Sequence, residues 1–136
     1  TIYDYNLGKA YVLNVRHPRG DFMVVGSAGF VPGLLAGRDV DTLVLGKGGL
    51  GSQTPQYRDR YWQHTAQAVD PERIVLIHWD SLTSPVNGPL KGEVRIAGLL
   101  MGGESQTLEY LRMQASRDPG VTLHTLPRFA PVLLFP

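Results

Sequence analysis

Short apolar runs recur along the chain and are separated by turn residues. Residues 10–27 hold two runs of strand-forming side chains, AYVLNV and FMVVG, on either side of Pro18 and Gly20, and this pattern predicts a β-hairpin. The runs DTLVLG (41–46) and RIVLIH (73–78) are continuously apolar, which is typical of strands covered on both faces. Two strands of a buried sheet are therefore expected after the hairpin.

Helical periodicity appears between these strands. Thr54 and Pro55 suit a helix start, because a threonine side chain caps free amides and proline is preset for the first turn. A helix is predicted over about 55–69, with one stripe repeating every four residues. The residues of this stripe are Tyr57, Tyr61, Thr65 and Val69. A second helix is predicted over about 104–117, ending at Pro119 and Gly120.

The remaining segments complete the predicted order of elements. A short helix is expected to open near Pro32, and two last strands are expected over VTLHTL (121–126) and PVLLF (131–135). The order β-β-(short α)-β-α-β-α-β-β indicates the α+β class, α/β-like in character, with a mixed sheet and helices on one face or both. The length of 136 residues suits a single domain, 1–136.

Composition excludes several functional classes. The chain has 13 basic and 12 acidic residues, and the basic residues are scattered, so we expect no nucleic-acid partner. The lack of cysteine excludes disulfides, thiolate nucleophiles and cysteine-based metal sites. No apolar stretch reaches membrane-spanning length and no signal peptide is visible, so we expect no membrane partner and a cytoplasmic location.

The glycine-rich segment GKGGLG (46–51) matches a G-x-G-x-x-G pattern between a strand and a helix. In a dinucleotide site the helix begins inside the motif, whereas here Pro55 marks a later start, and Asp80 follows Gly51 by more than the usual spacing of about 20 residues. These features favour a loop whose glycines permit positive φ or close approach of another segment.

Ser27, in VVGSAGF, follows a predicted strand, a position at which some hydrolases carry a nucleophilic serine. An elbow of the G-x-S-x-G type requires glycine two residues before the serine, where this chain has Val25. A serine that bonds to the amides of the following turn is the favoured interpretation.

His78 and Asp80 follow the apolar strand 73–78 and form the best candidate site. Ligands collect at the carboxyl ends of strands in open sheets, so the imidazole could bind a metal while the carboxylate orients it. The alternative is a hydrogen-bonded histidine that closes a buried strand. No His-x-His or His-x-x-x-His pair occurs, so local spacing gives no complete metal site.

Four segments are informative when taken together: FMVVGSAGFVPG, DTLVLGKGGLG, YRDRYWQHT and RIVLIHWDSLTSP. In combination they resemble the carboxyl-terminal half of a metallo-β-lactamase-fold hydrolase. The resemblance covers most of residues 10–135, and IHWD is its most specific part. It implies that His78 is the last metal ligand of a zinc site, that Asp80 orients a ligand, and that Ser27 stands where the family has a bridging aspartate. Trp79 and Lys47 would then shape the pocket.

The departures from the family pattern are as informative as the match. The principal motif, His-x-His-x-Asp-His, occurs nowhere in the chain, so most zinc ligands are missing and the chain alone is expected to be inactive. The family fold is a four-layer αββα sandwich, of which this chain would supply one half. Its exposed apolar sheet face would need a homo-oligomeric partner or a complementary amino-terminal half. The alternative is a non-catalytic half-domain that acts as a self-associating or binding module.

Overall fold

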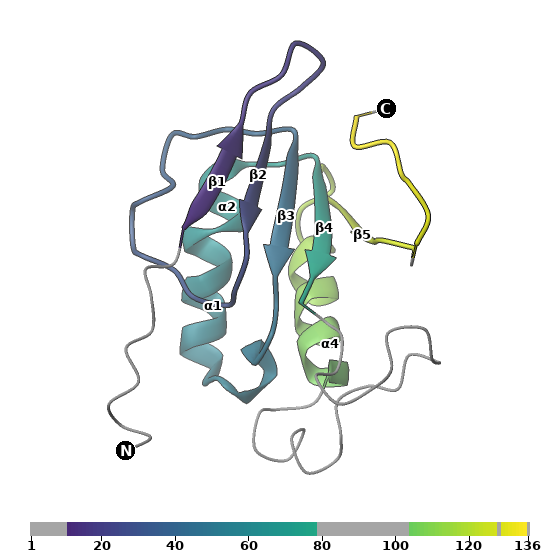
Figure 1. Cartoon of the computed structure of the whole chain (residues 1–136). Coiled ribbons are helices and arrows are strands. Elements are labelled where there is room, and N and C mark those ends of the chain that lie inside the picture. Colours follow the sequence, from purple (N-terminus) through teal and green to yellow (C-terminus); the bar gives the residue numbers. More distant parts are fainter. Residues whose placement is uncertain (1–10, 79–103, 128, 136) are drawn as a thin grey trace, which may run out of the picture.

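Five strands form one mixed sheet in the computed structural model, which describes residues 11–78, 104–127 and 129–135 (Figure 1). The strands are β1 (Val12–Val15), β2 (Phe22–Val25), β3 (Thr42–Gly46), β4 (Arg73–Ile77) and β5 (Thr122–Thr125). Their order in the sheet is their order in the chain, with β1 antiparallel to β2 and the other neighbours parallel. The predicted class, a mixed sheet with flanking helices, is confirmed, as is the hairpin.

The helices begin and end close to the predicted positions. They are η2 (Leu50–Ser52), α1 (Pro55–His64), α2 (Ala66–Val69) and α4 (Glu104–Ala115). Thr54 caps α1 as expected, because its Oγ1 accepts a hydrogen bond of 3.2 Å from the Tyr57 amide. The helix predicted over 55–69 is interrupted at Thr65, which has φ −119° and ψ −84°. No helix in the described parts of the chain is both long and apolar enough to cross a membrane.

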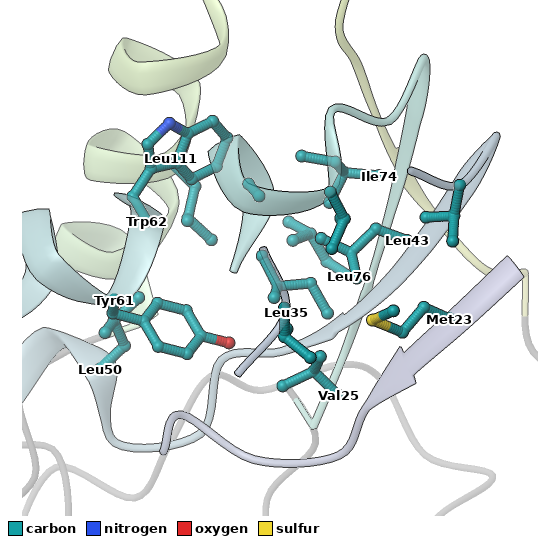
Figure 2. Packing of buried hydrophobic residues seen from close by; sticks show 14 of the residues in the cluster. Met23, Val25, Leu35, Leu43, Leu50, Tyr61, Trp62, Ile74, Leu76 and Leu111 are labelled. Carbon is teal, nitrogen blue, oxygen red and sulfur yellow. The ribbon is translucent and has the colours of Figure 1, made fainter. Parts of the chain in front are cut away.

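The hydrophobic core lies between the helices and one face of the sheet. Side chains alternate along each strand, so Met23, Leu43 and Ile74 share a row, and the register puts Leu45 and Leu76 beside them on the same face. Figure 2 shows the side chains of these strands packed with those of α1 and α4; among those labelled are Met23, Leu43, Ile74, Leu76, Tyr61, Trp62 and Leu111. Parallel strands added in one direction through right-handed crossovers put their helices on a single face, which is the arrangement in Figure 1.

The opposite face of the sheet is also apolar and is partly covered by the carboxyl-terminal segment. Arg73 donates from Nη1 to the carbonyl oxygens of Leu133 and Leu134, at 3.1 and 3.2 Å. The Phe135 ring stacks on His17, with centroids 5.6 Å apart. The strand predicted over 131–135 is therefore wrong: this segment lies as an irregular strap near the start of β4, held by side chains.

The short helix predicted near Pro32 is also wrong. Residues 32–37 form successive turns, in which the Leu34 amide donates to Val31 and the Ala36 amide donates to the Gly33 carbonyl. Gly33 and Gly37 have φ values of +77° and +71°, which lie outside the helical region. Two left-handed residues this close together prevent helix propagation.

Candidate functional site

The turns that follow β2, β3 and β4 meet at one edge of the sheet. The three strands are parallel, and the register aligns Val25 with Leu45 and Leu45 with Leu76. Their carboxyl ends therefore finish side by side, at the lower ends of the arrows in Figure 1. Ser27, Lys47 and His78 each lie within two residues of these ends. The topology brings all three to the same edge, where open sheets bind ligands.

His78 is exposed and adopts a left-handed backbone conformation, with φ +58°. Its ring lies against Gly48: a Cβ built on this glycine would be 2.6 Å from both Cε1 and Nδ1 of the imidazole. Left-handed residues other than glycine are uncommon, cost on the order of 1–3 kcal/mol, and cluster at functional sites. The backbone and Gly48 together fix where the imidazole is presented.

Gly46 allows the ends of β2 and β3 to approach closely. A Cβ at Gly46 would lie 2.5 Å from the Gly26 carbonyl carbon and 2.6 Å from the Ser27 nitrogen. No larger residue fits this position without moving backbone, so glycine is required by contact here. The Ser27 turn is thereby brought against the loop that holds Lys47.

Ser27 itself makes the local turn contact that its sequence context favours. Its side chain is exposed, and its Oγ accepts a hydrogen bond of 3.4 Å from the Gly29 amide. The hydroxyl stays at the sheet edge, where the resemblance to metallo-β-lactamase-fold enzymes expects a carboxylate. As a neutral group, it adds no negative charge to this edge.

The glycine-rich loop turns before α1 begins. The Lys47 amide donates to the Ile77 carbonyl at 3.2 Å, and the Lys47 carbonyl accepts from Leu50 at 3.0 Å. Gly49 has φ +73° and only the 3-10 turn η2 follows it, so α1 starts at Pro55 as predicted. The Lys47 side chain is 2% exposed. The loop thus uses its glycines for a positive φ and for close contacts, and lacks the early helix start of a dinucleotide site.

Two tyrosines of α1 contact the Ser27 turn through their hydroxyls. The Tyr61 hydroxyl lies 2.5 Å from the Gly46 carbonyl oxygen and 3.4 Å from that of Ser27, and the Tyr57 hydroxyl donates to the Ala28 carbonyl at 2.9 Å. Burial raises the pKa of the Tyr61 hydroxyl, with a smaller contribution from Tyr57, so it stays protonated and acts as a donor. Both residues were predicted only as members of a core-facing stripe.

The spacing of Tyr57 and Tyr61 in the sequence indicated that their hydroxyls would make hydrogen bonds in one region. Buried tyrosine hydroxyls need hydrogen-bond partners, and a stripe with tyrosine at positions i and i+4 directs both hydroxyls to the same region. What the stripe could not give was the identity of the partners, which belong to turns at distant positions in the chain.

Phe30 adds an aromatic contact to the same turn. Its ring lies 5.3 Å from the Tyr57 ring and 5.4 Å from the His64 ring, and the Arg60 guanidinium is 5.6 Å from its centroid. Such pairs contribute beyond the area they bury, by about 0.5–1.5 kcal/mol. The turn between Ser27 and Phe30 is therefore attached to α1 at several points.

The described residues do not supply a complete ligand set for zinc. Among residues 11–78 and the described positions beyond 103, no three His, Asp or Glu side chains are grouped so that they could hold a metal ion. His78 provides one nitrogen donor, whereas catalytic zinc sites use three protein ligands. Trp79 and Asp80, the other predicted site residues, lie outside the described residues.

Comparison of the chain with protein-family models, with curated proteins and with solved structures finds no match.

Proposed function

We propose that this chain forms part of a metal-dependent hydrolase of the metallo-β-lactamase type, in which His78 is a zinc ligand. One observation carries the proposal: an exposed imidazole, on a left-handed backbone and against Gly48, lies where three parallel strands end. The predicted pocket residues Ser27 and Lys47 lie at the same edge. Strained polar residues at such an edge are typical of binding and catalytic sites.

The chain's own residues account for part of the chemistry. Zinc in hydrolases lowers the pKa of a bound water and so supplies hydroxide near neutral pH. His78 would offer a ring nitrogen to the metal, and Ser27 would present a neutral hydroxyl where a carboxylate is commoner in the family. The remaining ligands would come from a half that carries the His-x-His-x-Asp-His motif, so the chain alone is expected to lack activity.

Zinc titration followed by NMR tests this assignment within a single spectrum. We expect zinc to shift the ring signals of His78 at concentrations that leave His17 and His124 unchanged, with weak affinity because a single imidazole is not a full ligand set. Zinc should also shift the backbone amide signal of Gly48, against which the ring lies, and His78→Ala should abolish that shift. His124→Ala is the matched control, since it removes an exposed imidazole from β5, and the response should persist.

Equal shifts at all exposed histidines would contradict the assignment, because they would indicate nonspecific binding of zinc to imidazole. A zinc response that survives in the His78→Ala protein would contradict it as well. Neither outcome requires a substrate to be known.

A second candidate function, a self-associating or binding module without catalysis, is supported by the second sheet face. Leu13 is aligned with Val24, Val24 with Val44, and Val44 with Val75, so an apolar row crosses four strands on this face. Leu13, at the end of the row, is 57% exposed. A chain that self-associates through this row and shows no zinc response at His78 would favour the module over the hydrolase.

A further inference from the structure

We propose that Tyr57 and Tyr61 are positioning residues that hold the Ser27–Phe30 turn at the candidate site. This inference rests on the proposed function in one respect: it takes the sheet edge near His78 to be the functional site. Its basis is that two hydroxyls from one helix contact backbone carbonyls of the turn after β2 and of Gly46, the last residue of β3.

The two hydroxyls act together because of helix geometry. Tyr57 and Tyr61 are four residues apart in α1, so both side chains project from the same helix face. A tyrosine hydroxyl has one proton, and the Tyr61 oxygen is much closer to the Gly46 carbonyl, at 2.5 Å, than to the Ser27 carbonyl, at 3.4 Å. Donation therefore goes to Gly46, while the oxygen lies between the ends of β2 and β3.

The carbonyls that these hydroxyls contact lie where the β-ladder ends. Paired residues of β2 and β3 finish at Val25 and Leu45, so the Gly46 and Ala28 carbonyls need partners other than that ladder. A phenylalanine would fill the same space but would leave buried polar groups unpaired. The phenolic oxygens therefore provide hydrogen bonds to these carbonyls, which ring packing alone would not.

The consequence is a chain of contacts from α1 to the candidate site. Tyr61 holds Gly46, the Gly46 backbone lies against Gly26 and Ser27, and Gly48 of the same loop supports the His78 ring. Tyr57 and the Phe30 ring fix the other end of the Ser27 turn. The hydroxyls of α1, added to the turn's own bond between Gly29 and Ser27, set where Ser27 lies relative to His78.

Three single substitutions test this inference on the full chain. Tyr57→Phe and Tyr61→Phe each remove one of the contacting hydroxyls and keep the ring. Tyr110→Phe is the matched control, because Tyr110 is also a buried residue, but its hydroxyl donates to Asp59, at 2.9 Å, between α4 and α1. The readouts are thermal melting, backbone NMR relaxation of residues 27–30, and the zinc response of the His78 ring.

All three variants should melt a few degrees lower, because each loses a buried or partly buried hydrogen bond. Only the Tyr57 and Tyr61 variants should mobilise the turn, with order parameters of residues 27–30 falling from about 0.85 to below about 0.6. The same two variants should weaken the zinc response of His78 several-fold, and Tyr110→Phe should leave it unchanged.

A turn as rigid in Tyr57→Phe and Tyr61→Phe as in Tyr110→Phe would overturn the inference, whatever zinc does. If Tyr61→Phe does not fold, Tyr57→Phe alone decides by the same criterion. A wild-type chain with no zinc response at His78 would overturn the proposed function instead, and the relaxation data would still decide whether the tyrosines position the turn.

Discussion

At the scale of single residues, Gly48 controls the imidazole of His78. A methyl group at this position would lie 2.6 Å from two ring atoms, so Gly48→Ala must push the ring aside. The ring is exposed and can move, so we expect a loss of unfolding free energy below about 1.5 kcal/mol, within the usual range for such contacts. The zinc-induced shift of the His78 ring should fall several-fold, measured by NMR titration.

Gly26→Ala is the matched control for this substitution. Its Cβ would meet no atom within 4 Å, although Gly26 lies at the same sheet edge. Zinc should therefore shift His78 in this variant as in the wild type. If Gly48→Ala and Gly26→Ala behave alike, the contact with Gly48 does not determine the position of the ring.

The location of His78 was predictable, but its conformation was not. An apolar run that ends in a polar side chain indicates a strand end, and the run 73–78 marked that end to within one residue. The positive φ of His78 has no such signal, because histidine is common in ordinary conformations and only surrounding contacts hold it in this one. Likewise, glycines in the 46–51 motif indicated close approach without saying that His78 approaches Gly48.

At the scale of elements, continuously apolar runs correctly predicted the strands that have another strand on each side in the sheet. The runs 41–46 and 73–78 became β3 and β4, at the centre of the sheet. The run 131–135 is equally apolar, yet it does not pair as a strand. Its Leu133 and Leu134 carbonyl oxygens accept hydrogen bonds from the guanidinium of Arg73, at the start of β4. Val132 and Leu133 stay exposed, at 48% and 73%, so the hydrophobicity of this run produced neither burial nor strand pairing.

The hydroxyls of Tyr61 and Tyr110 form hydrogen bonds between elements, and they should make the free energy of unfolding decrease at alkaline pH. Burial raises the pKa of Tyr61, and burial together with the hydrogen bond to Asp59 raises that of Tyr110. Above pH about 10 the unfolded chain releases these protons while the folded chain keeps them, so stability falls as pH rises. Each group contributes a slope of up to about 1.4 kcal/mol per pH unit. Urea unfolding between pH 9 and roughly 11 measures this slope.

The double variant Tyr61→Phe, Tyr110→Phe provides the comparison. It should be less stable than the wild type at neutral pH, because the hydrogen bond of Tyr61 to Gly46 and those of Tyr110 with Asp59 and Gln114 are lost. Its stability should nevertheless fall less steeply above pH about 10, since neither position titrates. Parallel slopes in the two proteins would show that these hydroxyls do not couple folding to alkaline pH.

At the scale of the whole molecule, the sheet has two unequal faces. One face carries α1, α2 and α4 and most of the fully buried side chains. The other carries the row from Leu13 to Val75, and the strap of residues 131–135 contacts the starts of β2, β3 and β4 beside that row. The strand order was beyond sequence reasoning, because short apolar runs indicate strands without indicating their neighbours. That the second face belongs to half of a sandwich remains a prediction from the resemblance.

We therefore expect the chain to self-associate through its second face at roughly tens of micromolar, because the row is incompletely buried toward its Leu13 end and exposed apolar surface favours association. Leu13→Asp puts a charge at the exposed end of the row and should yield monomers in light scattering, with the fold retained. Leu34→Asp is the control, since Leu34 is similarly exposed, at 51% against 57% for Leu13, but lies in the turns of residues 32–37. A wild-type chain that stays monomeric and binds no ANS at these concentrations would contradict the prediction. Equal dissociation by both variants would place the contact elsewhere, because only Leu13 is aligned with Val24 on that face.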